Sequence, residues 1–126
     1  MKILATDMDG TFLDHLGAYD KARLDSLLDA CEAKDYVFTV ASGRALLALE
    51  ELFDGFVDRI AIIAENGALV QYKGEVLFES KLDPKDYLEI ADTTLALPTC
   101  EGILLSGRRG AYAPNDADPA YLKAME

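Results

Sequence analysis

The sequence has little positive charge and little cysteine. Twelve Lys and Arg side chains stand against 23 Asp and Glu in 126 residues, which gives a formal net charge of −11. A protein that binds the phosphate backbone of nucleic acid needs a basic face, so we expect no nucleic-acid partner. The two cysteines, Cys31 and Cys100, show neither metal-binding spacing nor a disulfide pattern, and we expect reduced thiols.

Signals for a membrane or for export are also missing. No apolar stretch reaches the length needed to cross a bilayer, so we expect no membrane partner. The N-terminus enters an apolar strand pattern without the layout of a signal peptide. These absences favour a cytoplasmic protein. The apolar fraction of 51% is typical of a globular domain and argues against disorder.

What the sequence does contain is an alternation of strand and helix patterns. Residues 3–5 form a short apolar run without polar alternation, which is typical of a strand buried on both faces of a parallel sheet. Similar runs cover residues 36–41 and 59–64. Helix patterns lie between them, over residues 20–34 and 46–53. This order predicts an α/β fold, a partial Rossmann-like parallel sheet with flanking helices.

The pattern changes after Gly67. Residues 68–72 and 75–78 flank a Lys-Gly pair and predict a β-hairpin. Asp83 is then a helix cap, followed by Pro84 at the first helical position. This part of the chain therefore leaves the strand–helix alternation.

The last part of the sequence predicts a second, antiparallel module. Residues 102–106 and 111–113 are expected to form two short strands around a Gly-Arg-Arg-Gly turn. Asp118-Pro119 repeats the helix-start signal, and the sequence stops at Glu126. A helix that begins and is cut off suggests a fragment.

Polar residues follow each of the three predicted parallel strands. They are Asp7 and Asp9 after the first, Ser42 and Arg44 after the second, and Glu65 and Asn66 after the third. The carboxyl ends of parallel strands meet at one edge of a sheet, where open α/β sheets bind ligands. We therefore expect these side chains to form one site.

The residue types in this site suit phosphoryl transfer. The Asp7 carboxylate can attack phosphorus and form an acyl phosphate. Asp9 can protonate the leaving oxygen and then take a proton from water. Two neighbouring acids favour a bound cation, and Mg²⁺ suits carboxylate and phosphate oxygens. The Ser42 hydroxyl can donate to a phosphate oxygen, with turn amides near Asp9 and Gly43 as further donors.

Three motifs carry a family resemblance. Asp7-Met-Asp-Gly-Thr-Phe-Leu13 resembles the first signature of the haloacid dehalogenase superfamily, and Val40-Ala-Ser-Gly-Arg44 resembles its second signature in the Cof-type branch. Glu65-Asn-Gly-Ala68 and the hairpin also resemble that branch, in which the hairpin leads into an inserted α/β cap. The resemblance covers the whole chain. It implies that residues 1–82 are the N-terminal part of a core and that residues 83–126 begin a truncated cap.

The resemblance also implies an activity, that of a Mg²⁺-dependent phosphohydrolase acting on small phosphorylated metabolites such as sugar phosphates. Asp7 would be the phosphoryl acceptor and Asp9 the acid/base, and both would belong to the metal site, Asp9 through its backbone carbonyl. The residues implied to bind phosphate or substrate are Met8, Gly10, Thr11, Ser42, Gly43, Arg44 and Asn66.

Two parts of the family's pattern have no credible counterpart in this sequence, namely a later Lys beside the nucleophile and a second acidic segment of the metal site. We therefore expect the chain alone to be inactive. A phosphomutase of the same superfamily and a non-catalytic remnant that only binds remain open. Half a doubly wound sheet leaves an unpaired strand edge and uncovered apolar surface, which we expect to allow self-association.

Simpler interpretations stand beside these. Ser42 could only cap the second helix, and Asn66-Gly67 could be only a turn. Arg108-Arg109 is expected at a solvated turn. His15 is the only histidine, and we expect no catalytic role for it.

Overall fold

The computed structural model describes residues 1–117 and 119 of the chain. It divides the chain into two compact units, residues 1–80 and residues 81–126. The helix start predicted at Asp118 lies outside the described residues. Within them, no helix is long and apolar enough to cross a membrane.

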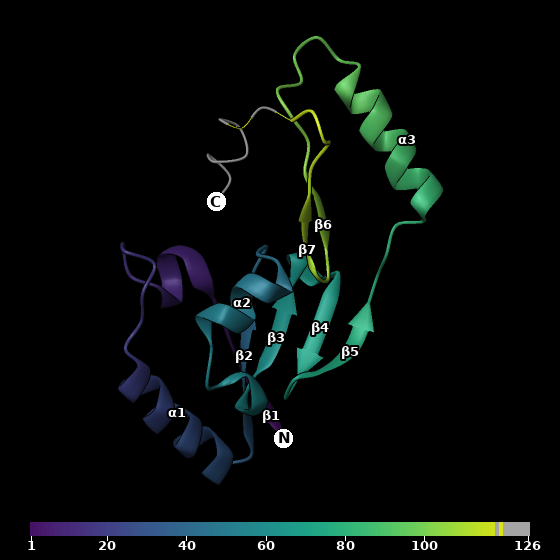
Figure 1. The fold of residues 1–126 in the computed structure, drawn as a ribbon. Helices are drawn as coiled ribbons and strands as arrows, with labels where there is room; N and C mark the ends of the chain where they lie inside the picture. Colours follow the sequence, from purple (N-terminus) through teal and green to yellow (C-terminus); the bar gives the residue numbers. More distant parts are fainter. Residues whose placement is uncertain (118, 120–126) are drawn as a thin grey trace. The chain divides into compact units, whose positions relative to one another are not determined.

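The first unit is built on a five-stranded mixed sheet with the order β1-β2-β3-β4-β5 (Figure 1). Its strands are β1 (Lys2–Asp7), β2 (Tyr36–Ala41), β3 (Ala61–Ala64), β4 (Leu69–Tyr72) and β5 (Glu75–Glu79). The pairs β1–β2 and β2–β3 are parallel, whereas β4 and β5 are added antiparallel as a hairpin. The predicted α/β fold and the predicted hairpin are confirmed.

Two helices connect the parallel strands, α1 (Lys21–Ala33) and α2 (Leu46–Leu52). Asp20 caps α1, since its carboxylate accepts the backbone N–H of Arg23 at 3.0 Å. Right-handed connections that step in one direction across a sheet place both helices on the same face.

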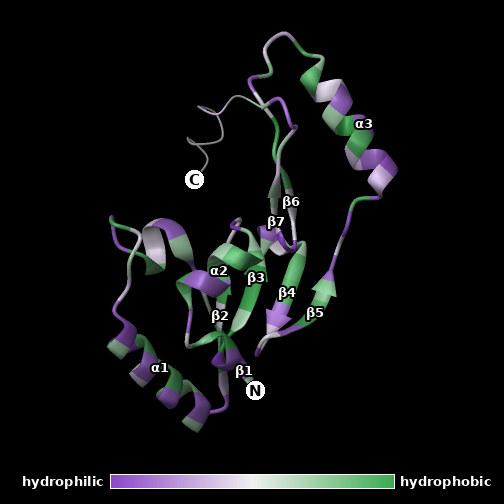
Figure 2. Ribbon diagram, viewed as in Figure 1, coloured by the Kyte–Doolittle hydropathy of each residue, from purple (hydrophilic) through white to green (hydrophobic). Residues whose placement is uncertain are grey.

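The helices and the sheet share one apolar core. Its buried members are Met8, Leu13, Leu24, Leu28, Cys31, Phe38, Val40, Leu46, Leu49, Phe53, Ile60, Ile62, Ala64 and Leu69. In Figure 2 the inner strands β2 and β3 are mostly green, the colour of hydrophobic residues. Burial of this surface is the main stabilising contribution to the first unit.

The other face of the sheet is less covered. The register aligns Ala41 of β2 with Ile63 of β3, then with Val70 of β4 and Phe78 of β5. The first three are half-buried and Phe78 is exposed. This row of apolar side chains has no helix of the first unit against it, because both helices lie on the opposite face.

The prediction that the first strand is buried on both faces is wrong for the described chain. Ile3 is 66% exposed and Leu4 is 41% exposed. The reason is position, since β1 lies at the edge of the sheet and pairs only with β2. An apolar run indicates that a strand prefers burial, but other segments must supply the cover.

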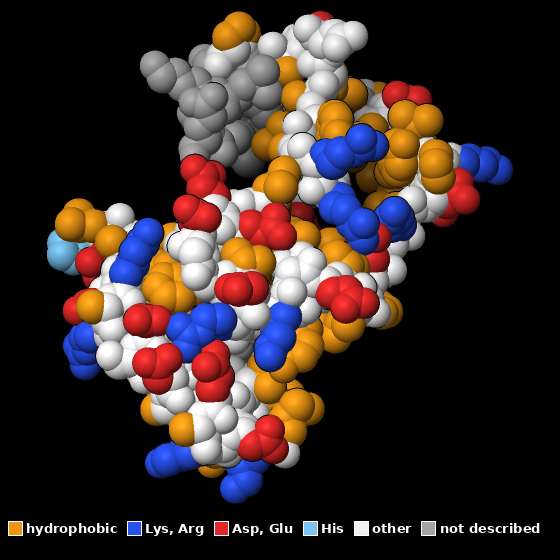
Figure 3. Space-filling model, turned by 60° about the horizontal axis from the view of Figure 1, so that its bottom comes forward, with side chains coloured by type: hydrophobic (Ala, Val, Ile, Leu, Met, Phe, Trp, Pro, Cys, Tyr) orange, Lys and Arg blue, Asp and Glu red, His pale blue; other side chains and the backbone are white. Residues whose placement is uncertain are grey.

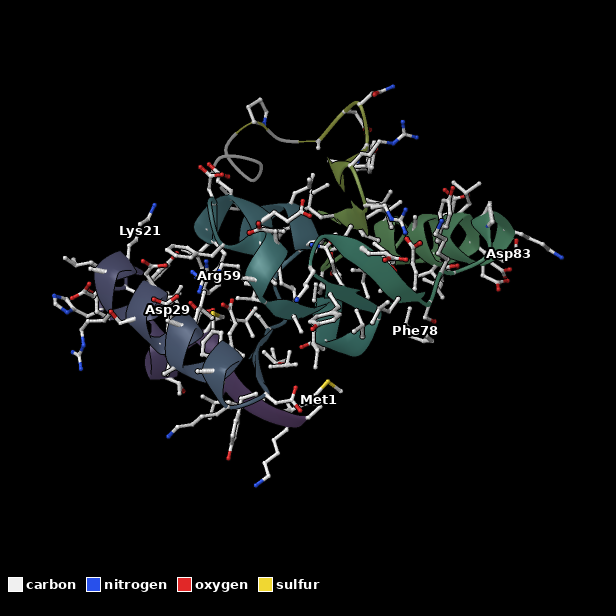
Figure 4. All side chains as sticks on the ribbon, turned by 90° about the horizontal axis from the view of Figure 1, so that it is seen from below. Met1, Lys21, Asp29, Arg59, Phe78 and Asp83 are labelled. Carbon is white, nitrogen blue, oxygen red and sulfur yellow. The ribbon has the colours of Figure 1, made fainter. Side chains whose placement is uncertain are left out.

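A cluster of ion pairs fastens α1 to the segment that precedes β3. The Arg59 guanidinium donates through Nε to Glu32 at 2.8 Å, through Nη1 to Asp25 at 2.6 Å and through Nη2 to Asp29 at 2.7 Å. Figure 4 shows the labelled Arg59 and Asp29 side by side. The three acids lie along one side of α1, and their hydrogen bonds to Arg59 raise the pKa of the guanidinium further above its ordinary value.

The second unit contains α3 (Pro84–Leu95) and a hairpin of β6 (Leu105–Gly107) and β7 (Gly110–Tyr112). Asp83 caps α3 by accepting the backbone N–H of Lys85 at 2.9 Å, as predicted from Asp83-Pro84. Most apolar side chains of α3 and the segment after it are exposed, among them Leu88, Ile90, Leu95 and Leu97.

Candidate active site

The register of the parallel strands brings three chain segments to one edge of the sheet. Asp7, the last residue of β1, lies beside Ala41, the last residue of β2, and Ala41 lies beside Ile63 of β3. The polar residues that follow these positions therefore leave the sheet at the same edge. This is the arrangement in which α/β sheets place their ligand sites.

The first segment is a tight turn over Met8–Phe12. Met8 is fully buried, and its backbone carbonyl accepts the N–H of Leu13 at 3.0 Å. Met8 can therefore serve a site only through its backbone. Gly10 adopts φ +75°, which a residue without Cβ tolerates at little cost. The turn leaves Gly10, Thr11 and the two acids at the surface.

Asp7 is exposed at the end of β1. In the part of the chain that the structure describes, no hydrogen bond or ion pair engages that carboxylate. An unengaged carboxylate at this edge can act as a nucleophile or as a metal ligand.

The second segment is a turn at Ser42 and Arg44. The backbone N–H of Ser42 donates to the carbonyl of Ile63 at 2.9 Å, and the N–H of Arg44 donates to the Ser42 Oγ at 3.1 Å. Because the hydroxyl oxygen accepts this bond, its proton stays available for donation. The interpretation of Ser42 as a helix cap is wrong, because Ala45 is the N-cap of α2 and no side chain caps it.

The third segment, Glu65–Gly67, is hydrogen-bonded to the second. The N–H of Asn66 donates to the carbonyl of Ser42 at 3.2 Å, and the N–H of Glu65 donates to the carbonyl of Arg44 at 3.0 Å. Glu65 and Asn66 have φ of 53° and 55°, and Gly67 follows with 95°. Two successive non-glycine residues in the left-handed region are unusual, and such strain persists where surrounding contacts impose it.

Gly43 and Asn66 approach each other closely. A Cβ built on Gly43 would lie 2.9 Å from Oδ1 and 3.2 Å from Nδ2 of the Asn66 carboxamide. A glycine at position 43 therefore lets the carboxamide lie directly over the Ser42-Gly43 turn. The structure brings the predicted residues of the second and third strand ends into contact.

An ion pair joins the first segment to the second. The Arg44 guanidinium donates to both oxygens of Asp9, from Nε to Oδ2 at 3.0 Å and from Nη2 to Oδ1 at 2.5 Å. The hydrogen bonds from Arg44, with a smaller contribution from its charge, lower the pKa of Asp9. The sequence did not predict this pair. The signal available was the register, since both residues follow the aligned positions Asp7 and Ala41 by two or three residues.

The oxygen donors at this edge are of the kind that Mg²⁺ accepts, the Asp7 carboxylate and the Asp9 backbone carbonyl. They are few. Among the described residues, no group of three or more His, Cys, Asp or Glu is placed to hold a metal ion. Figure 3 shows acidic side chains spread over the visible surface, with the basic side chains in small separate groups.

The remaining candidate residues lie elsewhere. His15 is exposed in the loop between Asp14 and Ala18, which is closed by the Asp14 carboxylate accepting the N–H groups of Leu16 and Ala18. Arg108 and Arg109 lie in the turn of the β6–β7 hairpin, in the second unit.

Comparison with known proteins covers nearly the whole chain. Residues 4–125 match the family of haloacid dehalogenase-like hydrolases. The 5-amino-6-(5-phospho-D-ribitylamino)uracil phosphatase YbjI of Escherichia coli (strain K12) is 32% identical over 126 residues. That alignment covers 100% of this chain and 46% of the relative, so the chain spans about half the length of the relative.

Solved structures show the same fold. SMU.1108c from Streptococcus mutans UA159 matches with a TM-score of 0.85 and 30% identity, over 98% of this chain and 46% of that one. A haloacid dehalogenase-like hydrolase from B. subtilis matches with a TM-score of 0.75 and 22% identity, over 100% of this chain and 43% of that one. Both similarities extend over both units.

Proposed function

Because this chain belongs to the family of haloacid dehalogenase-like hydrolases, we propose that it supplies the nucleophile-bearing part of a Mg²⁺-dependent phosphohydrolase. The observation that carries the proposal is the shared sheet edge. There the unengaged Asp7 carboxylate lies on the last residue of β1, and the turn at Ser42 follows the paired last residue of β2.

The proposed reaction has two displacements. The Asp7 carboxylate attacks phosphorus and forms an aspartyl phosphate, while Asp9 gives a proton to the departing oxygen. Water then attacks the aspartyl phosphate and gives a proton to Asp9, which releases phosphate and restores Asp7. The first displacement thus leaves Asp9 deprotonated, as the second requires, and the second protonates it again.

The phosphate would be bound by the turn that follows Asp7 and by the turn at Ser42. The Ser42 hydroxyl has a proton to donate, and the backbone N–H groups around Gly10 and Gly43 are further donors. Mg²⁺, when bound, would neutralise charge on phosphate and carboxylate oxygens, and the Asp7 carboxylate and the Asp9 carbonyl would hold it. Asn66 would lie on the leaving-group side, over Gly43.

The substrate we propose is a small phosphorylated metabolite such as a sugar phosphate. The E. coli relative, a phosphatase for 5-amino-6-(5-phospho-D-ribitylamino)uracil, supports this class. The strongly negative charge of the chain agrees with a small substrate rather than nucleic acid. We propose a cytoplasmic location, which agrees with a sequence in which no apolar stretch reaches the length needed to cross a bilayer.

We further propose that residues 1–82 are the beginning of the catalytic core and that residues 83–126 begin a cap. In this proposal a later Lys and a second acidic segment complete the site, so the 126 residues alone turn over little or no substrate. The exposed Ile3 and Leu4 on the unpaired edge of β1 support self-association of the isolated chain. A monodisperse monomer that melts cooperatively and hydrolyses phosphate esters with Mg²⁺ would contradict this proposal.

The test of the phosphohydrolase uses the protein as its gene encodes it. With Mg²⁺ we expect hydrolysis of a generic aryl phosphate, and formation of a beryllium fluoride adduct on the parent protein. Asp7→Asn should abolish both, because an amide is a poor nucleophile. If Asp7→Asn hydrolyses the aryl phosphate at the parent rate, the assignment of the nucleophile is wrong.

A further inference from the structure

The Asp9–Arg44 ion pair joins the turn after β1 to the turn after β2. Asp9 precedes Gly10, and Arg44 is the one described residue that bonds the Asp9 carboxylate. The backbone of Arg44 is held on both sides, since its N–H donates to Ser42 Oγ and its carbonyl accepts the N–H of Glu65. The guanidinium therefore extends from a hydrogen-bonded backbone to a carboxylate for which the described residues supply no other hydrogen bond.

Stability does not explain this pair. The Asp9 side chain is 63% exposed and the Arg44 side chain 37%. Exposed ion pairs contribute about 0–1 kcal/mol, little beside the burial of the first unit's core. The pair therefore matters more for the orientation of the two side chains than for the free energy of folding.

The geometry is that of a fork. Nε and Nη2 each bond a different oxygen of Asp9, so both the position and the plane of the carboxylate are set. A lysine could supply the charge but not the fork, because an ammonium is a single point charge.

We propose that Arg44 is a positioning residue, whose guanidinium holds the Asp9 carboxylate in the orientation required to accept the proton of the attacking water beside Asp7. The inference rests on the proposed function and goes beyond it, because the resemblance placed Arg44 only on the substrate side. In this proposal Arg44 touches neither the substrate nor the nucleophile Asp7. It acts through Asp9, and its removal should leave the nucleophile unchanged.

The test compares Arg44→Lys and Arg44→Gln with the parent in the full encoded protein. We expect kcat for an aryl phosphate to fall by about ten- to a hundredfold, since a small misplacement of a catalytic group costs rates of this order. KM should stay unchanged and the beryllium fluoride adduct at Asp7 should still form. Lysine should not rescue kcat, because it keeps the charge and loses the fork.

Arg59→Lys is the matched control. It removes another multiply bonded guanidinium, but Arg59 precedes β3 and so lies at the opposite end of that strand from Asn66. We expect its kcat to equal that of the parent. The inference would be overturned if both Arg44 variants kept the kcat of the parent. It would also be overturned if Arg44→Lys were faster than the parent, because the ion pair would then hold Asp9 in an inactive orientation. Failure of the parent to form the adduct would instead overturn the proposed function.

A second measurement does not depend on turnover. In NMR spectra of the parent, the Nε–H proton of Arg44 should exchange slowly with water, and Asp9→Asn should make it exchange faster. Thermal melting of the same samples shows whether each variant is folded. A rapidly exchanging Nε–H in the folded parent protein would overturn the inference.

Discussion

Replacement of Gly43 by alanine tests the contact between two of the three strand ends. The backbone of Gly43 lies outside the left-handed region, so alanine is compatible with it. The new methyl group would meet the Asn66 carboxamide, at 2.9 Å from Oδ1 and 3.2 Å from Nδ2. Both atoms belong to the end of an exposed side chain, so we expect Asn66 to turn away while the Ser42-Gly43 turn stays in place.

Two opposing contributions set the magnitude. Glycine to alanine at a compatible position stabilises a protein by about 0.4–1 kcal/mol, because the unfolded chain loses freedom. Overpacking costs about 1–3 kcal/mol, and an exposed, movable neighbour places this case near the lower end. We therefore expect Gly43→Ala to change the free energy of unfolding by less than about 1 kcal/mol, while displacing Asn66.

The assay is a double-mutant cycle with Asn66→Gly, measured by urea unfolding of the full encoded protein. Glycine removes the carboxamide and tolerates the φ of 55° at this position. In that background Gly43→Ala should stabilise by about 0.4–1 kcal/mol, so the cycle should give a coupling of about 1 kcal/mol. Equal effects of Gly43→Ala in both backgrounds, within about 0.3 kcal/mol, would refute the contact.

Three further substitutions probe the first unit. Phe53→Ala removes a fully buried ring of the core and should lower the free energy of unfolding by about 3–5 kcal/mol, seen in urea melts; a loss below 1 kcal/mol would place Phe53 outside the core. Tyr19→Phe removes the hydroxyl that donates to the Leu52 carbonyl at 2.8 Å and should cost about 1 kcal/mol at neutral pH. Burial and the charge of Asp54 raise the pKa of Tyr19, so its stabilising effect is complete below the unfolded pKa and is lost as pH rises through the folded one. The phenylalanine variant should show a weaker loss of stability above about pH 10, and identical pH profiles would contradict the assignment. Arg59→Met should lower the melting temperature, with the difference from the parent shrinking at high salt, because three charge-assisted hydrogen bonds are lost.

Local sequence signals predicted the elements of the fold well. The cap at Asp20, the proline after Asp83 and the turn between residues 72 and 75 each mark a boundary within a few positions of the observed one. Such signals act through hydrogen bonds and backbone preferences of neighbouring residues, so a single sequence contains them. The convergence of the strand ends also follows from sequence, because parallel pairing aligns Asp7 with Ala41.

What the sequence could not predict depends on contacts between distant segments. The exposure of Ile3 follows from the edge position of β1, which an apolar run does not encode. The pairing of Asp9 with Arg44 depends on the direction of two side chains after two separate turns. The role of Ser42 in its own turn, rather than as a cap of α2, depends on where that helix begins.

The central claim is that the Asp7 carboxylate becomes phosphorylated. The most direct test mixes the full encoded protein with Mg²⁺ and an aryl phosphate, quenches during turnover with borohydride, and analyses the N-terminal peptide by mass spectrometry. Reduction of an acyl phosphate converts aspartate to homoserine, so we predict homoserine at position 7. Unmodified aspartate at position 7 during sustained turnover, or homoserine at position 9 in its place, would contradict the account.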